Sequence, residues 1–100
     1  MKTITSKELA KLINENTPIQ LIDVREFHEH ERYNIGGEII PFAKITQYLG
    51  IIEKKIPVIV YCKKGLRSHI AIQRLELIFP FENLFNLSGG IDEWKKYLAK

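Results

Sequence analysis

The stretch VIVYCKKGLRSHIAI, residues 58–72, contains the only cysteine of this 100-residue chain, Cys62. The residues that lead to it, IPVIVY at 56–61, are apolar almost throughout. Such a run is typical of a strand that is buried on both faces of a parallel sheet. Residues 66–79 follow with the apolar spacing of a helix. The sequence therefore predicts that Cys62 lies where a buried strand turns into a helix.

The rest of the chain alternates in the same way between helical and extended patterns. Thr5 and Glu8 have the spacing of a capping box at the start of a helix. We expect helices over residues 5–16, 26–33, 43–52 and 66–79. A last helix near the end of the chain is expected to pack Ile91, Trp94 and Leu98. We expect strands over residues 19–24, 56–61 and 83–87 and over a short stretch after Gly36-Gly37. This alternation predicts one α/β domain over residues 1–100, with a central, mostly parallel sheet and helices on both faces.

Composition narrows the class of protein. Hydrophobic residues make up 45% and charged residues 27% of the chain, and the formal net charge is +3. The lysine pairs are dispersed, so no basic stripe indicates a nucleic-acid partner. A single cysteine excludes a scaffold of intrachain disulfides, and we see neither a signal peptide nor a run of membrane-spanning length. We therefore expect a cytoplasmic protein that binds neither nucleic acid nor membranes.

The residues around Cys62 favour an activated thiol. Gly65 permits an unusual backbone turn, and such turns point successive amide N–H groups toward an anion. The following helix adds its positive N-terminal end, and Lys63, Lys64 and Arg67 add cations. This setting favours the thiolate, which is the nucleophilic form. Asp23 and Arg25 end the strand at 19–24, and in a parallel sheet they emerge at the same edge as Cys62.

A cradle of N–H groups and cations fits an oxyanion near sulfur, such as a thiosulfonate, a phosphate or an arsenate. Only four residues separate Cys62 from Arg67. Because a phosphate needs room for three further oxygens, a loop this short better fits one extra sulfur atom on the cysteine.

Four segments, taken together and in this order, resemble the rhodanese sulfurtransferase family. They are LIDVRE at 21–26, NIGGEIIP at 34–41, VIVYCKKGLRS at 58–68 and LSGGIDEW at 87–94, and the resemblance extends over about residues 4–97. The chain departs from the family at YNIGGE, where members often have GHIPGA: Asn34 stands in place of a histidine. This region usually supports the surroundings of the loop.

The resemblance implies a rhodanese-like α/β fold and a persulfide mechanism. Cys62 would take a sulfane sulfur from thiosulfate or a persulfide donor and pass it to cyanide or to a thiol, including one on an acceptor protein. The substrate-binding loop would comprise Lys63, Lys64, Gly65, Leu66, Arg67 and Ser68, and Asp23 and Arg25 would support it. Neither a metal nor an organic cofactor is expected. The family's phosphatases and arsenate reductases carry a loop one residue longer, so the loop length of this chain implies a sulfurtransferase.

Other interpretations stay open beside this one. The chain could be a non-catalytic binding module or a sulfur carrier, and a phosphatase or arsenate reductase on the same fold is the less favoured enzyme. A lone cysteine is often a small buried hydrophobe. His28 and His30 lie two residues apart and favour a solvated helix over a metal site. His69 lies just past the loop, where a helix would direct it to solvent. Asp23 and Arg25 are more typical of a structural ion pair than of catalytic groups.

Overall fold

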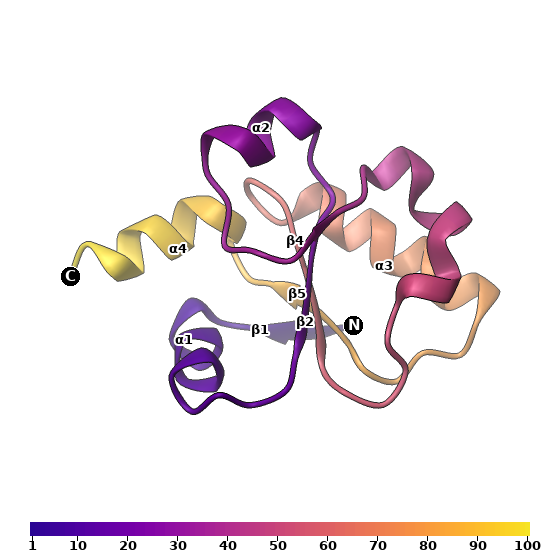
Figure 1. Cartoon of the computed structure of the whole chain (residues 1–100), viewed down its shortest axis with the longest axis horizontal. Helices are drawn as coiled ribbons and strands as arrows, with labels where there is room; N and C mark the ends of the chain where they lie inside the picture. Colours follow the sequence, from indigo (N-terminus) through magenta and orange to yellow (C-terminus); the bar gives the residue numbers. More distant parts are fainter.

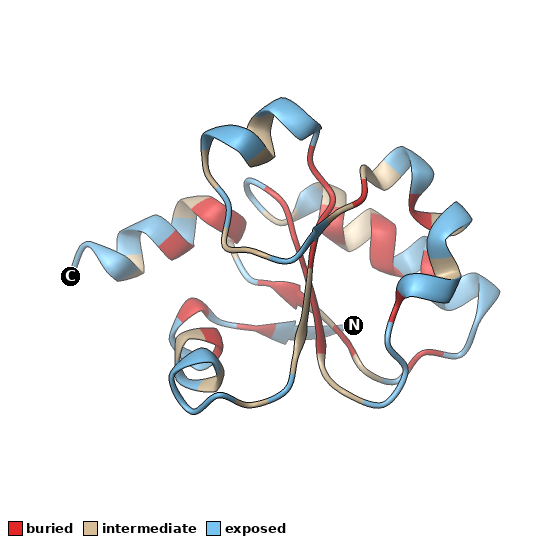
Figure 2. Ribbon diagram, in the orientation of Figure 1, coloured by how far each residue is buried: buried red, intermediate tan, exposed pale blue.

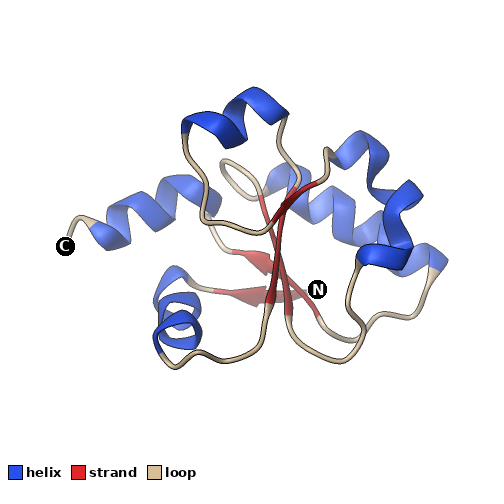
Figure 3. Ribbon diagram, in the orientation of Figure 1, coloured by secondary structure: helices blue, strands red, loops and turns tan.

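The computed structural model describes residues 1–100, the whole chain. Its helices and strands form a three-layer α/β arrangement, with the strands in the centre and the helices around them (Figures 1 and 3). In chain order they are β1 (Lys2–Ile4), α1 (Ser6–Asn14), β2 (Gln20–Asp23), α2 (Phe27–Arg32), β3 (Glu38–Ile39), the 3-10 helix η1 (Phe42–Ile51), β4 (Val58–Tyr61), α3 (Leu66–Ile78), β5 (Leu84–Leu87) and α4 (Gly90–Leu98).

The five strands form one sheet in the order β1-β5-β4-β2-β3, and every neighbouring pair is parallel. The sequence analysis missed β1, which has only three residues and pairs with β5 at the edge of the sheet. A three-residue segment is too short to show a period of two. The expected parallel sheet is confirmed, and it is parallel throughout.

Helices cover both faces of the sheet, as expected, because each face carries its own apolar cluster (Figure 2). One cluster joins Val58 and Val60 of β4 to Ile72 and Leu75 of α3 and to Ile45 of η1. The other cluster joins the alternate residues of β4, Ile59 and Tyr61, to helices α1 and α4. Its other buried members are Ile4, Leu9, Leu87, Ile91 and Trp94. All four residues of β4 are buried, which explains its uninterrupted apolar sequence.

The ends of the helices agree with the sequence in most places. Thr5 caps α1, and the reciprocal hydrogen bonds between Thr5 and Glu8 complete the predicted capping box.

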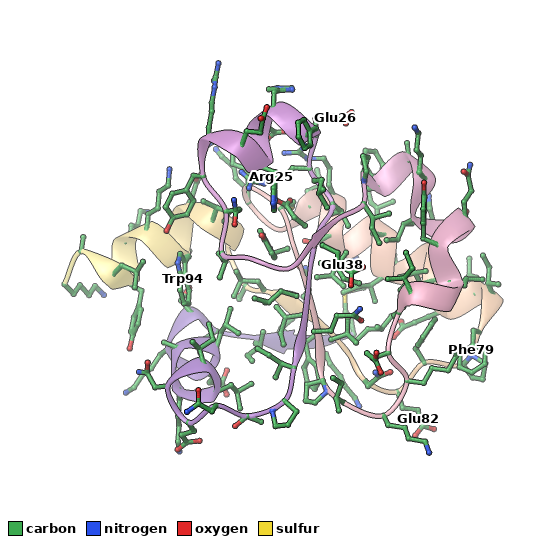
Figure 4. The ribbon with its side chains drawn as sticks, in the orientation of Figure 1. Arg25, Glu26, Glu38, Phe79, Glu82 and Trp94 are labelled. Carbon is green, nitrogen blue, oxygen red and sulfur yellow. The ribbon has the colours of Figure 1, made fainter.

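Trp94 extends from α4 toward α1 and is buried, as predicted (Figure 4). The prediction for Leu98 is wrong: its side chain lies in the last turn of α4, beyond the sheet, and is 55% exposed. None of the helices is both long enough and apolar enough to cross a membrane.

The site lies at the point where the strand order reverses. From β2 the chain moves outward to β3, and from β4 it moves the other way to β5. Asp23, the last residue of β2, is in register with Tyr61, the last residue of β4. Ligands of open parallel sheets bind beyond the carboxyl ends of the strands at such a reversal. The following residues, Val24-Arg25 and Cys62, therefore emerge side by side.

Candidate active site

Cys62 directly follows β4 and lies at the base of a hollow of about 210 Å³. We call it the Cys62 hollow, and its lining is Cys62, Lys63, Lys64, Leu66 and Arg67. The cysteine itself is only 1% exposed, so its sulfur is reached from this side. Gly65 turns the chain into α3 with a φ of +101°, a conformation that favours glycine. The strand-to-helix junction predicted from the sequence is thus present.

The sulfur of Cys62 is surrounded by donors. The backbone N–H of Gly65 lies 3.1 Å from Sγ and that of Ser68 lies 3.4 Å from it. The oxygen of Ser68 lies 3.3 Å from Sγ, but its hydroxyl proton is donated to Asn86 Oδ1, so the two N–H groups are the donors to sulfur. The loop thus directs two N–H groups at one sulfur atom.

The direction of the remaining amide N–H groups of the loop follows from the hydrogen bonds that its carbonyl groups accept. The carbonyl of Cys62 accepts from Ile91 N–H at 2.9 Å, and that of Lys63 accepts from Asp92 N–H at 3.0 Å. In a trans peptide the N–H points opposite to the carbonyl, so the Lys63 and Lys64 amides are directed away from α4. The N–H groups of Lys63, Lys64, Leu66 and Arg67 donate to no protein atom. Four free amides beside the Cys62 sulfur form a nest for an anion.

Gly90 allows this contact between the loop and α4. A Cβ atom at position 90 would lie 2.5 Å from the Cys62 carbonyl oxygen and 2.6 Å from the Lys63 carbonyl carbon. Gly90 also has a φ of +60°. A glycine at position 90 is therefore what allows the first turn of α4 to reach the loop.

Asn86 of β5 supports the loop from below, and the sequence analysis missed it. Its side chain is buried, donates to the Gly65 carbonyl at 3.0 Å, and accepts from the Ser68 hydroxyl at 2.5 Å. Because Ser68 in turn contacts the Cys62 sulfur, Asn86 fixes both the turn and the hydroxyl. The signal that could have identified it is the single amide side chain in the otherwise apolar strand LFNL, residues 84–87.

Asp23 and Arg25 form a buried ion pair at the edge of the sheet. Arg25 Nη2 lies 2.7 Å from Asp23 Oδ2, and it also donates to the Tyr33 carbonyl at 2.6 Å. Burial alone would lower the pKa of Arg25, but the hydrogen bond and the charge of Asp23 raise it above its ordinary value. Figure 4 shows Arg25 beneath α2. The pair thus joins β2 to the segment that follows α2, in the structural arrangement that the sequence favoured.

His30 also contacts this pair, so the prediction of a solvated His30 is wrong. Its Nδ1 lies 2.9 Å from Asp23 Oδ2, and its side chain is only 17% exposed. The contact crosses seven residues of sequence, from α2 back to the end of β2. Local spacing cannot reveal it, because it depends on how α2 folds back over the sheet.

Replacing Asp23 by asparagine is expected to lower the free energy of unfolding by about 2 kcal/mol, because Arg25 would keep its buried charge without a counterion. The asparagine carbonyl still accepts one hydrogen bond, which limits the loss. Urea denaturation measures the change. Glu31→Gln is the matched control, since Glu31 is exposed on α2 and forms no ion pair. Equal stabilities of the two variants would contradict this role of Asp23.

Arg67 reaches back to α2. Its guanidinium donates to the two carboxylate oxygens of Glu29 at 2.8 and 3.1 Å. This hydrogen bonding with Arg67 lowers the pKa of Glu29 to about 2. Arg67 thus lines the Cys62 hollow and also forms an ion pair with Glu29. This partner was not predicted from the sequence.

Glu29→Gln tests this pair through the pH dependence of stability. Because the pKa of Glu29 in the folded protein is about 2 against an ordinary value of 4.5, its carboxylate stabilises the fold above pH 4.5 and ceases to do so as the pH falls toward 2. Both side chains are partly exposed, so we expect at most about 1 kcal/mol. The stability difference between wild type and variant should be present at pH 7 and shrink in acid. A difference independent of pH would contradict the assignment.

The other residues of the predicted loop differ in their surroundings. Lys63 forms an exposed ion pair with Asp92 at 3.1 Å, while Lys64 is exposed and forms none. Leu66 is 69% exposed at the rim of the Cys62 hollow. No hydrogen bond joins His69 to Cys62. The backbone of residues 63–68 thus surrounds the sulfur, while the lysine side chains extend into solvent.

The match to known proteins agrees with this geometry. The rhodanese-like domain family matches residues 5–97. The chain belongs to the rhodanese-like domain family. This confirms the resemblance found in the sequence and the fold class that it implied.

Several known proteins resemble the chain over nearly its whole length. The thiosulfate sulfurtransferase GlpE of Coxiella burnetii is 30% identical over 97 residues, which is 96% of this chain and 89% of that protein. The uncharacterized protein YqhL of Bacillus subtilis is 37% identical, over 94% of this chain and 72% of that protein. The crystal structure of a rhodanese-like domain protein from Staphylococcus aureus is 30% identical and superimposes with a TM-score of 0.83, over 94% of this chain and 91% of that chain.

Proposed function

We propose that this rhodanese-like protein is a sulfurtransferase that carries a sulfane sulfur on Cys62. The observation that carries the proposal is the ring of amides around one sulfur atom. Two N–H groups donate to Sγ itself, and four more N–H groups of the same loop have no protein partner. A persulfide adds one sulfur atom and keeps the negative charge, so this loop has donors for both sulfur atoms.

In the first step the Cys62 thiolate attacks the outer sulfur of thiosulfate. A new S–S bond forms, the S–S bond of thiosulfate breaks, and sulfite leaves with the electron pair. The persulfide anion remains on Cys62, where the free amides of Lys63, Lys64, Leu66 and Arg67 stabilise it. Arg67 and the two lysines favour the approach of an anionic donor.

In the second step an acceptor nucleophile, a thiolate or cyanide, attacks the terminal sulfur of the persulfide. The bond between the two sulfur atoms breaks, and Cys62 leaves as a thiolate. The N–H groups of Gly65 and Ser68 stabilise that leaving group. Asp23 and Arg25 contact neither sulfur, and we assign them a supporting role through α2 and its contact with Arg67.

Relatives support the reaction class. The GlpE relative is named as a thiosulfate sulfurtransferase, and it matches this chain over nearly its full length. A probable adenylyltransferase/sulfurtransferase, MoeZ of Mycobacterium tuberculosis, is 33% identical over 96% of this chain, although the match covers only 25% of that protein. The feature shared by these names is sulfur transfer.

The test is a direct comparison of two reactions on the purified protein. We expect thiocyanate to form from thiosulfate and cyanide, and we expect no hydrolysis of an aryl phosphate, since only four residues separate Cys62 from Arg67. Phosphate release without thiocyanate formation would contradict the proposal and favour phosphatase chemistry on the same fold.

A further inference from the structure

A second hollow lies beside the Cys62 loop, between α2 and α4. Its volume is about 300 Å³, at the lower end of the range for small-molecule sites. We call it the α2–α4 hollow; its charged and aromatic lining comprises Arg25, Glu29, Arg32, Tyr33, Lys63, Asp92 and Lys95. In the proposed sulfur transfer Lys63 favours the approach of the donor and Arg25 has a supporting role, but no step uses Arg32, Tyr33 or Lys95.

The charges of this hollow do not cancel. Within its lining, Lys63 pairs with Asp92, while Arg25 and Glu29 pair with Asp23 and Arg67, which lie outside it. Two cations remain, Arg32 on α2 and Lys95 on α4, and neither takes part in an ion pair. The α2–α4 hollow therefore has a surplus of two positive charges.

One of the two remaining cations lies over an aromatic ring. Lys95 Nζ is 4.5 Å from the centre of the Tyr33 ring, and both side chains line the hollow. Arg32 lines the same hollow. A guanidinium binds a carboxylate through two parallel hydrogen bonds. A carboxylate with an apolar stem is the group that this combination fits.

The α2–α4 hollow is adjacent to the Cys62 hollow. Lys63 lines both of them. In addition, Glu29 of the α2–α4 hollow forms an ion pair with Arg67 of the Cys62 hollow. A molecule bound in the α2–α4 hollow therefore lies next to the residues that line the Cys62 hollow.

We infer that the α2–α4 hollow binds the carboxylate of a small thiol that accepts sulfur from Cys62. This inference rests on the proposed sulfur transfer. The thiolate of the acceptor attacks the terminal sulfur of the persulfide, the sulfur–sulfur bond breaks, and Cys62 leaves as a thiolate. The product is the persulfide of the carboxylate-bearing thiol. Arg32 and Lys95 select the acceptor by its charge and touch no reacting atom.

The test compares 6-mercaptohexanoate with 6-mercaptohexanol as acceptors from the preformed persulfide. The double variant Arg32→Gln/Lys95→Gln should lower the rate constant for the carboxylate about fivefold and leave that for the alcohol unchanged, as two exposed charge interactions predict. Lys11→Gln/Lys100→Gln is the matched control, because it removes the same charge from exposed positions outside the hollow. Persulfide formation with thiosulfate and its discharge by cyanide should be unchanged in both variants.

A preference for the carboxylate that survives the double variant, or falls equally in the Lys11/Lys100 control, would overturn the inference. A binding measurement separates it from the proposed function. Titration with the unreactive thioether 6-(methylthio)hexanoate should shift backbone amide resonances of α2 and α4 in the wild type but not in the double variant. If thiosulfate yields no persulfide, the proposed function fails, and this titration alone decides whether the hollow binds a carboxylate; the absence of shifts would overturn that as well.

Discussion

Cys62→Ser is expected to abolish the formation of thiocyanate from thiosulfate and cyanide while the fold survives. A serine hydroxyl is a far weaker nucleophile than a thiolate and does not form a stable adduct with sulfane sulfur. The donors around Sγ, the Gly65 and Ser68 amides, can still bond to a hydroxyl oxygen, so the loop keeps its partners. The steady-state rate of thiocyanate formation measures the effect.

Urea denaturation of the same variant provides the control. The substitution replaces one small buried side chain with another, so we expect the free energy of unfolding to change by no more than about 1–2 kcal/mol. An unfolded variant would leave the loss of activity uninterpretable, and Cys62→Ala then serves as the replacement because it adds no buried polar group. Sulfur transfer that persists in a folded variant would contradict the role of Cys62.

Gly90→Ala is expected to lower the kcat/KM for thiosulfate about 100-fold, the effect of displacing a reacting group by about 1 Å. The new Cβ would lie 2.5 Å from the Cys62 carbonyl oxygen and 2.6 Å from the Lys63 carbonyl carbon, and these atoms are backbone that cannot rotate away. The loop and α4 must therefore separate. The hydrogen bonds from Ile91 and Asp92 that hold the two carbonyls would weaken, and the amides would lose their direction.

Gly50→Ala is the matched control for this variant. Nothing lies within 4 Å of a Cβ at position 50, and Gly50 is not among the glycines with positive φ. We expect it to keep wild-type activity. The assay is run at a temperature where circular dichroism shows both variants folded, so that a loss reflects the loop. Equal activity of the two variants would show that the contact between α4 and the loop does not orient the amides.

The parts of this fold that the sequence predicts are those with a local cause. The capping box of Thr5 and Glu8, the buried apolar strand before Cys62 and the turn at Gly65 each depend on residues within a few positions of one another. The parallel sheet follows from the alternation of such elements. These features were predicted correctly because short-range propensity and tertiary packing agree there.

The parts that the sequence did not predict depend on contacts between distant segments. Asn86 meets Gly65 and Ser68 across 21 and 18 residues, and Arg67 meets Glu29 across 38. His30 and Gly90 likewise acquire their roles only when α2 and α4 fold over the ends of β2 and β4. The sequence therefore placed Cys62 at a strand-to-helix loop, but did not reveal the neighbours that hold the loop in place.

The most direct test is the intact mass of the reduced protein before and after incubation with thiosulfate, with Cys62→Ser treated in parallel. The proposed mechanism predicts a gain of one sulfur atom in the wild type, reversed by cyanide and absent in the variant. An unchanged mass in a folded protein whose thiol still reacts with an alkylating reagent would contradict it, because the amides around Cys62 would then not suffice to take sulfur from this donor.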